Sequence, residues 1–147
     1  MKLEGTFMVP APRETVWQHL MNPDTLSKSL PGCEKLEAQP DGSFHAEMKV
    51  GIGAVKGAYK GRVELFDQVA PERFRIKVDG KGTGGFLKAE GMLTLLGAGQ
   101  ETLVGYTGEA QVGGVIAGVG QRMVLGAARQ IVQHFFQTFS KIVTPPG

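Results

Sequence analysis

The feature that most constrains the fold is an apolar helical pattern near the C-terminus, over residues 113–143. Read at 3.6 residues per turn, its apolar positions cover an arc wider than the stripe of about 100° that faces the core in an ordinary surface helix. Each large apolar side chain that becomes buried contributes roughly 1.5–3 kcal/mol. We therefore expect one long helix that other elements cover on more than one side.

The two halves of this pattern differ in bulk. The first half carries small residues such as Gly118, Gly120 and Ala127, whereas the second half carries Phe135 and Phe136. An interior glycine costs about 1 kcal/mol of helix stability relative to alanine. The thin half therefore predicts either close packing of the helix backbone on its neighbours or room for a ligand beside the helix.

Before this pattern, apolar and polar residues alternate with a period of two, which is typical of half-buried strands. Pairs that contain glycine or proline separate the alternating runs and fit hairpin turns. One face of the runs is charged and the other is apolar, as in an antiparallel sheet that is covered on one side. The pattern predicts a meander of six strands, at residues 33–39, 43–52, 55–68, 73–82, 86–96 and 101–112.

The N-terminal part predicts one strand followed by two short helices. Residues 3–9 alternate as a strand does, and Pro10 ends them. Asn22 and Pro23 are a typical cap and first residue of a helix, and Pro31 ends that helix. We expect an α+β fold: a seven-stranded curved antiparallel sheet around a long C-terminal helix, with two short helices after the first strand. The expected domain covers residues 1–143, and residues 144–147 form a Pro-rich tail.

Composition and charge limit the class of protein. The 147 residues fit one domain, and a net charge of +2 gives no electrostatic footprint for nucleic acid. The single Cys33 excludes an intramolecular disulfide, and residues 1–4 open without the pattern of a secretory signal. No run approaches the 18 apolar residues of a membrane span. We expect a soluble cytoplasmic domain.

The motifs that resemble catalytic or cofactor sites favour structural roles. Residues 80–85 satisfy the pattern GxGxxG, but a strand pattern follows where a dinucleotide site needs a helix, so a hairpin is predicted. His19, His45, His134 and Cys33 fall in separate elements without the paired spacing of a zinc site, and no metal is expected. Cys33 is interpreted as a small buried residue, and no catalytic residue is assigned.

Several segments resemble one protein family. FMVPAP at residues 7–12, LPGCEKL at 30–36 and VGGVIAGVGQR at 112–122 resemble the family of the carbon monoxide dehydrogenase G subunit, and the likeness covers essentially the whole chain. That family belongs to the START-like, helix-grip (SRPBCC) superfamily, together with polyketide cyclases and birch-pollen allergens. The resemblance implies an internal apolar cavity that binds a hydrophobic small molecule.

The resemblance also implies partners and a location. Family members are associated with molybdenum hydroxylases of the carbon monoxide dehydrogenase type, in maturation, membrane recruitment or electron transfer to quinone. Many carry a longer C-terminal tail with an apolar anchor, whereas this sequence stops at residues 144–147, so it is either a short member or part of a longer chain. We expect a cytoplasmic protein with peripheral contact at the inner face of the cell membrane.

Our hypothesis from the sequence is a non-enzymatic module that holds a lipid, isoprenoid or quinone-like molecule between the sheet and the last helix, without other cofactors. Two alternatives stay open: a cyclase- or hydrolase-like enzyme of the same fold, and an assembly factor that acts through its surface. Tyr59 and Tyr106 are the candidate polar handles. The expected lining residues are Leu26, Leu30, Met48, Val50, Tyr59, Phe74, Ile76, Leu87, Met92, Tyr106, Ile116, Val119 and Met123.

Overall fold

The computed structural model describes residues 1–144, so most of the expected tail, residues 145–147, lies outside the described residues. The strands are β1 (Lys2–Val9), β2 (Cys33–Ala38), β3 (Phe44–Val50), β4 (Gly57–Val69), β5 (Arg73–Gly82), β6 (Gly85–Ala98) and β7 (Glu101–Gly113). The helices are α1 (Arg13–Leu20), α2 (Pro23–Ser29), the short 3-10 helix η1 (Gly53–Val55), α3 (Val115–Gly118) and α4 (Gln121–Val143).

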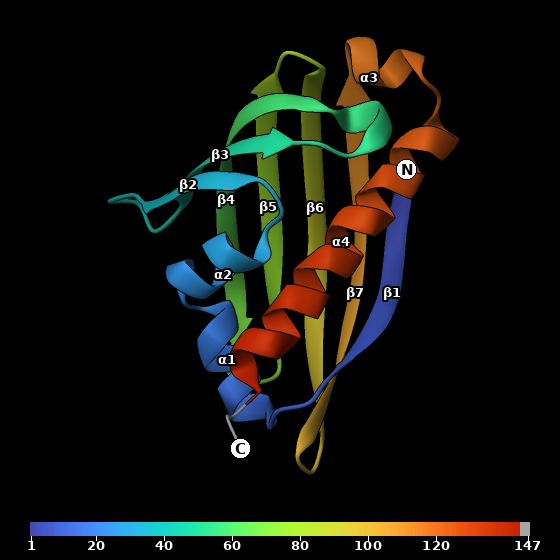
Figure 1. The fold of residues 1–147 in the computed structure, drawn as a ribbon. Coiled ribbons are helices and arrows are strands. Elements are labelled where there is room, and N and C mark those ends of the chain that lie inside the picture. The colour runs from blue at the N-terminus through green and yellow to red at the C-terminus, as the bar shows by residue number, and fades with distance from the viewer. Residues whose placement is uncertain (145–147) are drawn as a thin grey trace.

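The seven strands form one antiparallel sheet in the order β1-β7-β6-β5-β4-β3-β2. Each strand from β2 to β7 pairs with the next along the chain, and β1 completes the order by pairing with β7. Figure 1 shows the sheet curving around α4, with α1 and α2 at the lower end and α3 at the upper end. The predicted α+β architecture, including all seven strands and the two short helices, is confirmed.

The local signals that define α2 act as predicted. The side chain of Asn22 accepts a hydrogen bond of 2.9 Å from the backbone N–H of Asp24, and Pro23 is the first residue of α2. The predicted hairpin at residues 80–85 is also confirmed, because β5 ends at Gly82 and β6 begins at Gly85.

The prediction of one helix over residues 113–143 is wrong for residues 113–120. Strand β7 continues to Gly113, the single turn α3 follows, and α4 begins only at Gln121. Gly114 and Gly120 have φ angles of 79° and 96°, which L-residues with a side chain rarely adopt. At Gly114 a Cβ would also lie only 2.8 Å from the Cα of Gly85. These glycines interrupt the helix, although the apolar period continues across them.

The core lies at the lower end of the molecule, where the second half of α4 packs against β1, β6, β7 and α1. The ring of Phe136 stacks on Phe7 and Tyr106, with centroid separations of 5.4 and 6.2 Å. Phe135 stacks on Phe139 with their ring centroids 5.7 Å apart. The buried residues that form this contiguous core are Val9, Ala11, Val16, Leu20, Phe74, Leu95, Val104, Phe136, Phe139 and Val143.

This arrangement predicts that stability depends on the aromatic half of α4. Phe139 is 0% exposed, and Phe139→Ala should lower the free energy of unfolding by about 3–5 kcal/mol, because it removes buried surface and leaves a cavity. Met123 lies on the same helix but is 60% exposed, so Met123→Ala should change stability by less than about 0.5 kcal/mol. Urea unfolding measures both. Equal losses in the two variants would contradict this location of the core.

Candidate functional site

The inner face of the sheet, which faces α4, differs in burial between its two ends. At the lower end, Phe74, Leu95 and Val104 are buried by α1 and by the aromatic half of α4. At the upper end, inner-face residues of the same central strands are only half-buried. The central strands have a paired strand on each side at both ends, so strand pairing does not explain the difference in burial. The difference arises from how much of each end the helix covers.

The residues at this poorly covered end are small and apolar. In the strand register Gly61 lies opposite Gly80, Ala89 lies opposite Ala110, and Gly91 lies opposite Gly108. None of these six residues is fully buried. We call this region the upper inner surface and define it by Gly61, Val78, Gly80, Leu87, Ala89, Gly91, Gly108, Ala110 and Val112.

The first half of α4 and the turn α3 face this end of the sheet without joining the main core. Ile116, Val124 and Ala127 are buried, but they do not belong to the contiguous core cluster. A Cβ added at Gly126 would meet no other atom within 4 Å. Close backbone packing explains Gly114, where a Cβ would lie 2.8 Å from the Cα of Gly85, but it does not explain Gly126.

Tyr59, at the upper end of the sheet, forms a hydrogen bond to another part of the protein. Its hydroxyl donates a hydrogen bond of 2.8 Å to the carbonyl oxygen of Val55 in η1, and burial raises the pKa of the phenol. Gly84 makes room for the ring, since a Cβ there would lie 2.5 Å from the Tyr59 oxygen and 3.1 Å from Ile116. The predicted polar handle Tyr59 is therefore already used to hold η1.

Tyr106 lies where the core meets the upper inner surface. One side of its ring stacks on Phe136, and its hydroxyl points at Gly5, where a Cβ would come within 2.5 Å of the oxygen. Within residues 1–144 this hydroxyl makes no hydrogen bond to a protein group. Tyr106 thus differs from Tyr59, whose hydroxyl is bonded to the protein.

The other expected lining residues separate into three groups. Met48 and Val50 on β3, Leu87 on β6 and Ile116 on α3 lie with Tyr59 around the upper end. Phe74 is buried in the core, against which Leu26 and Ile76 pack, while Leu30 is the half-buried residue that ends α2. Val119 and Met123 are exposed, because the helical run is interrupted at Gly120 instead of continuing as one covered helix.

Met92 is a correction, because it lies on the outer face of the sheet. It pairs with Arg75 on β5 and Thr107 on β7, whereas the neighbouring Leu93 pairs with Phe74 and Tyr106 on the inner face. Successive side chains of a strand point to opposite faces. Met92 therefore cannot line a site between the sheet and α4.

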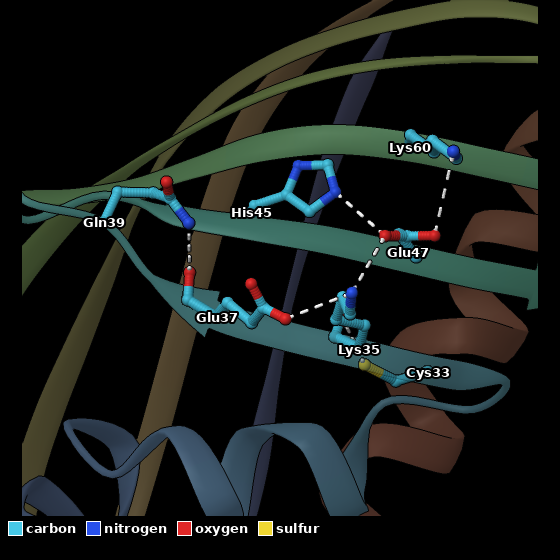
Figure 2. A network of polar contacts seen from close by, with 7 residues as sticks. All are labelled: Cys33, Lys35, Glu37, Gln39, His45, Glu47 and Lys60. Atoms are coloured by element: carbon cyan, nitrogen blue, oxygen red, sulfur yellow. Dashed lines mark hydrogen bonds and ion pairs between the residues drawn. The ribbon is translucent and has the colours of Figure 1, made fainter.

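The outer face carries a polar network that sequence reasoning did not find. Figure 2 shows Glu47 at its centre, with its carboxylate 3.1 Å from His45 Nε2 and within 3.9 Å of Lys35 and Lys60. The hydrogen bond from His45, aided by the two lysines, lowers the pKa of Glu47. Cys33 is not part of this carboxylate network: it lies opposite Met48 of β3, and its half-buried thiol accepts a hydrogen bond of 3.6 Å from Ser27 Oγ on α2 and donates a weak one of 3.5 Å to the carbonyl oxygen of Lys35.

Two open hollows, of about 560 and 550 Å³, lie beside this network on the outer face, and neither lies between the sheet and α4. Both include Lys60 and Lys81 in their walls. Among the described residues no group of three or more His, Cys, Asp or Glu side chains could hold a metal ion. In the same residues no helix is both long enough and apolar enough to cross a membrane.

Comparison with known proteins identifies the family. The model of the family described as the carbon monoxide dehydrogenase G subunit (CoxG) matches residues 5–144. The chain belongs to this family. The resemblance noted at residues 7–12, 30–36 and 112–122 is thereby confirmed. Among curated protein sequences, none matches significantly.

Solved structures show the same fold. A conserved protein from Geobacillus kaustophilus is 35% identical, with a TM-score of 0.94 over 97% of this chain and 95% of that one. A START superfamily protein from Mycobacterium smegmatis is 15% identical, with a TM-score of 0.77 over 97% and 96%. Norcoclaurine synthase from Thalictrum flavum, solved with dopamine and hydroxybenzaldehyde, is 15% identical, with a TM-score of 0.65 over 97% and 86%. The fold thus serves both enzymes and other START-like proteins.

The two tyrosines should respond differently to loss of the hydroxyl. Tyr59→Phe removes the bond to Val55 and should cost roughly 0.5–1.5 kcal/mol, with faster amide hydrogen exchange around η1. Tyr106→Phe breaks no hydrogen bond within the described residues, so stability and exchange should stay near those of the unmodified protein. Unchanged exchange at residues 53–57 in Tyr59→Phe would show that its hydroxyl does not hold this segment.

Proposed function

We propose that this protein binds a hydrophobic small molecule, of the lipid, isoprenoid or quinone-like class, between the upper inner surface and the first half of α4. The observation that carries this proposal is the incomplete burial of small apolar residues in the middle of the sheet, whereas Phe74, Leu95 and Val104 at the lower end are buried. Exposed apolar surface in such a concave position favours an apolar occupant.

The chemistry of the proposed site suits binding better than turnover. The upper inner surface consists of glycine, alanine, valine and leucine, which provide neither an acid nor a base for proton transfer. Tyr106 would supply one hydroxyl to orient a carbonyl or hydroxyl group of the ligand, as buried phenols commonly do. Val119 and Met123, both exposed beside α3, would then flank the entrance.

The comparisons support a role in binding. The family name links relatives of this chain to carbon monoxide dehydrogenase, and a structural neighbour of this fold was solved with two small aromatic molecules. On this basis we propose that the bound molecule serves a hydroxylase of that type, in maturation, membrane recruitment or electron transfer to quinone. The surface-acting assembly factor is the competing role, in which the apolar site would stay empty.

A variant that fills the proposed site tests the hypothesis. Ala127 is buried on the thin half of α4, so Ala127→Trp should occupy the space and weaken binding of a short-chain ubiquinone analogue or a fatty acid at least about tenfold. Binding would be measured by native mass spectrometry and by fluorescence titration. Ala98→Trp makes the same change at an exposed position at the far end of β6 and should bind normally.

Folding of the variant must be separated from its binding. Circular dichroism and urea unfolding check that Ala127→Trp is folded, and Ala89→Phe provides a second obstruction on the half-buried sheet wall. Mass spectrometry of an organic extract from detergent-free native protein would identify the ligand. If neither probe binds and the extract is empty, the assembly-factor role replaces this proposal. Equal binding by all three variants would move the ligand away from this surface.

A further inference from the structure

The outer face of the sheet concentrates positive charge around one of the two hollows. The hollow of about 560 Å³ is lined by His45, Lys60, Arg62, Lys81 and Lys88, with Asp79 as its one carboxylate. Arg62 is engaged elsewhere, since it bonds to Asp41 and Glu64 at 3.1 and 3.0 Å. The three lysines provide the remaining charge.

These lysines are poorly neutralised by the protein. Lys60 lies directly opposite Lys81 in the pairing of β4 with β5, and like charges placed directly opposite each other destabilise a sheet. The carboxylate near Lys60 is Glu47, at 3.9 Å, and it is shared with Lys35 and His45. Within residues 1–144 neither Lys81 nor Lys88 forms an ion pair, although Lys88 lies opposite Asp79 in the register. An anion between them would relieve this repulsion.

An aromatic ring is fixed at the edge of the same hollow. Phe86 lies opposite Lys81 in the pairing of β5 with β6 and is 41% exposed. On β7 it lies opposite Gly113, where any Cβ would collide with the Phe86 ring. The ring therefore rests against the bare backbone of Gly113 and leaves its other side open. A planar group can stack there while an attached anion reaches the lysines.

We propose that this outer hollow, lined by Lys60, Lys81, Lys88 and Phe86, is a binding site for a nucleoside phosphate. The lysines would bind the phosphate groups, and Phe86 would stack on the base. The site borders the β-hairpin that the GxGxxG segment at residues 80–85 forms, and its binding groups are side chains of β4, β5 and β6 rather than the N-terminus of a helix. It is separated by the sheet from the proposed apolar site, and each can fail without the other.

Isothermal titration of the full chain with ADP at low ionic strength tests the site, with pyrophosphate and adenosine as component probes. We expect saturable binding of one ADP that weakens as salt is added. Lys81→Gln and Lys88→Gln should each weaken ADP and pyrophosphate binding about tenfold, because each removes a charge-assisted contact. Phe86→Leu should weaken ADP binding about fivefold or more and leave pyrophosphate binding unchanged. Lys141→Gln, on α4, is the matched control and should bind ADP normally.

Three results would overturn the proposal. The first is the absence of saturable ADP binding. The second is ADP affinity that Lys81→Gln and Lys88→Gln leave unchanged, which would place the nucleotide elsewhere. The third is a pair of observations: pyrophosphate binds as tightly as ADP, and Phe86→Leu leaves the ADP affinity unchanged. Together they would show a general anion site without recognition of the base. None of these variants touches the inner face, so uptake of the apolar probes should be normal in all of them.

Discussion

The structure depends on the packing of the aromatic half of α4 against the lower half of a curved sheet. Phe136 and Phe139 join strands from both ends of the chain and the helix α1 into one core. A single straight helix that crosses a twisted sheet can contact it closely over only part of its length, and Figure 1 shows α4 crossing diagonally. Close packing at the lower end therefore leaves the upper end less covered by the helix.

The glycines of the upper end fit this difference between the two ends. Glycine within a strand weakens the sheet, yet Gly61, Gly80, Gly91 and Gly108 cluster on the inner face where α4 covers it least. At Gly61 and Gly91 the sheet itself also excludes a side chain, because an added Cβ would collide with the backbone oxygen of Asp79 at the first and lie 2.6 Å from that of Thr107 at the second. The burial pattern, rather than any single residue, therefore supports the proposed apolar site.

Most of the fold can be predicted from the sequence, because its elements follow from local periodicity. The alternation of residues 33–112 predicts the six consecutive strands, and Asn22 with Pro23 predicts the start of α2. The break before α4 cannot be predicted in this way, since an apolar period of 3.6 carries no information about the positive φ angles of Gly114 and Gly120. The prediction that Met92 and Leu87 line the same site is wrong, because the two residues are five positions apart in β6. Residues an odd number of positions apart in a strand point to opposite faces.

The outer hollow could not be predicted, because its residues become neighbours only through the register of four strands. Lys60, Lys81 and Phe86 come from three hairpin-linked strands, and a shift of one residue in any pairing would move them to opposite faces. The same register places the apolar residues of these strands on the inner face. One set of backbone pairings thus fixes both surfaces at once.

A ligand on either face that binds only the folded sheet would stabilise that shared register, by about 2.7 kcal/mol at a concentration of about 100 times its dissociation constant. The two proposed sites are therefore separate in chemistry but linked through the stability of the sheet between them.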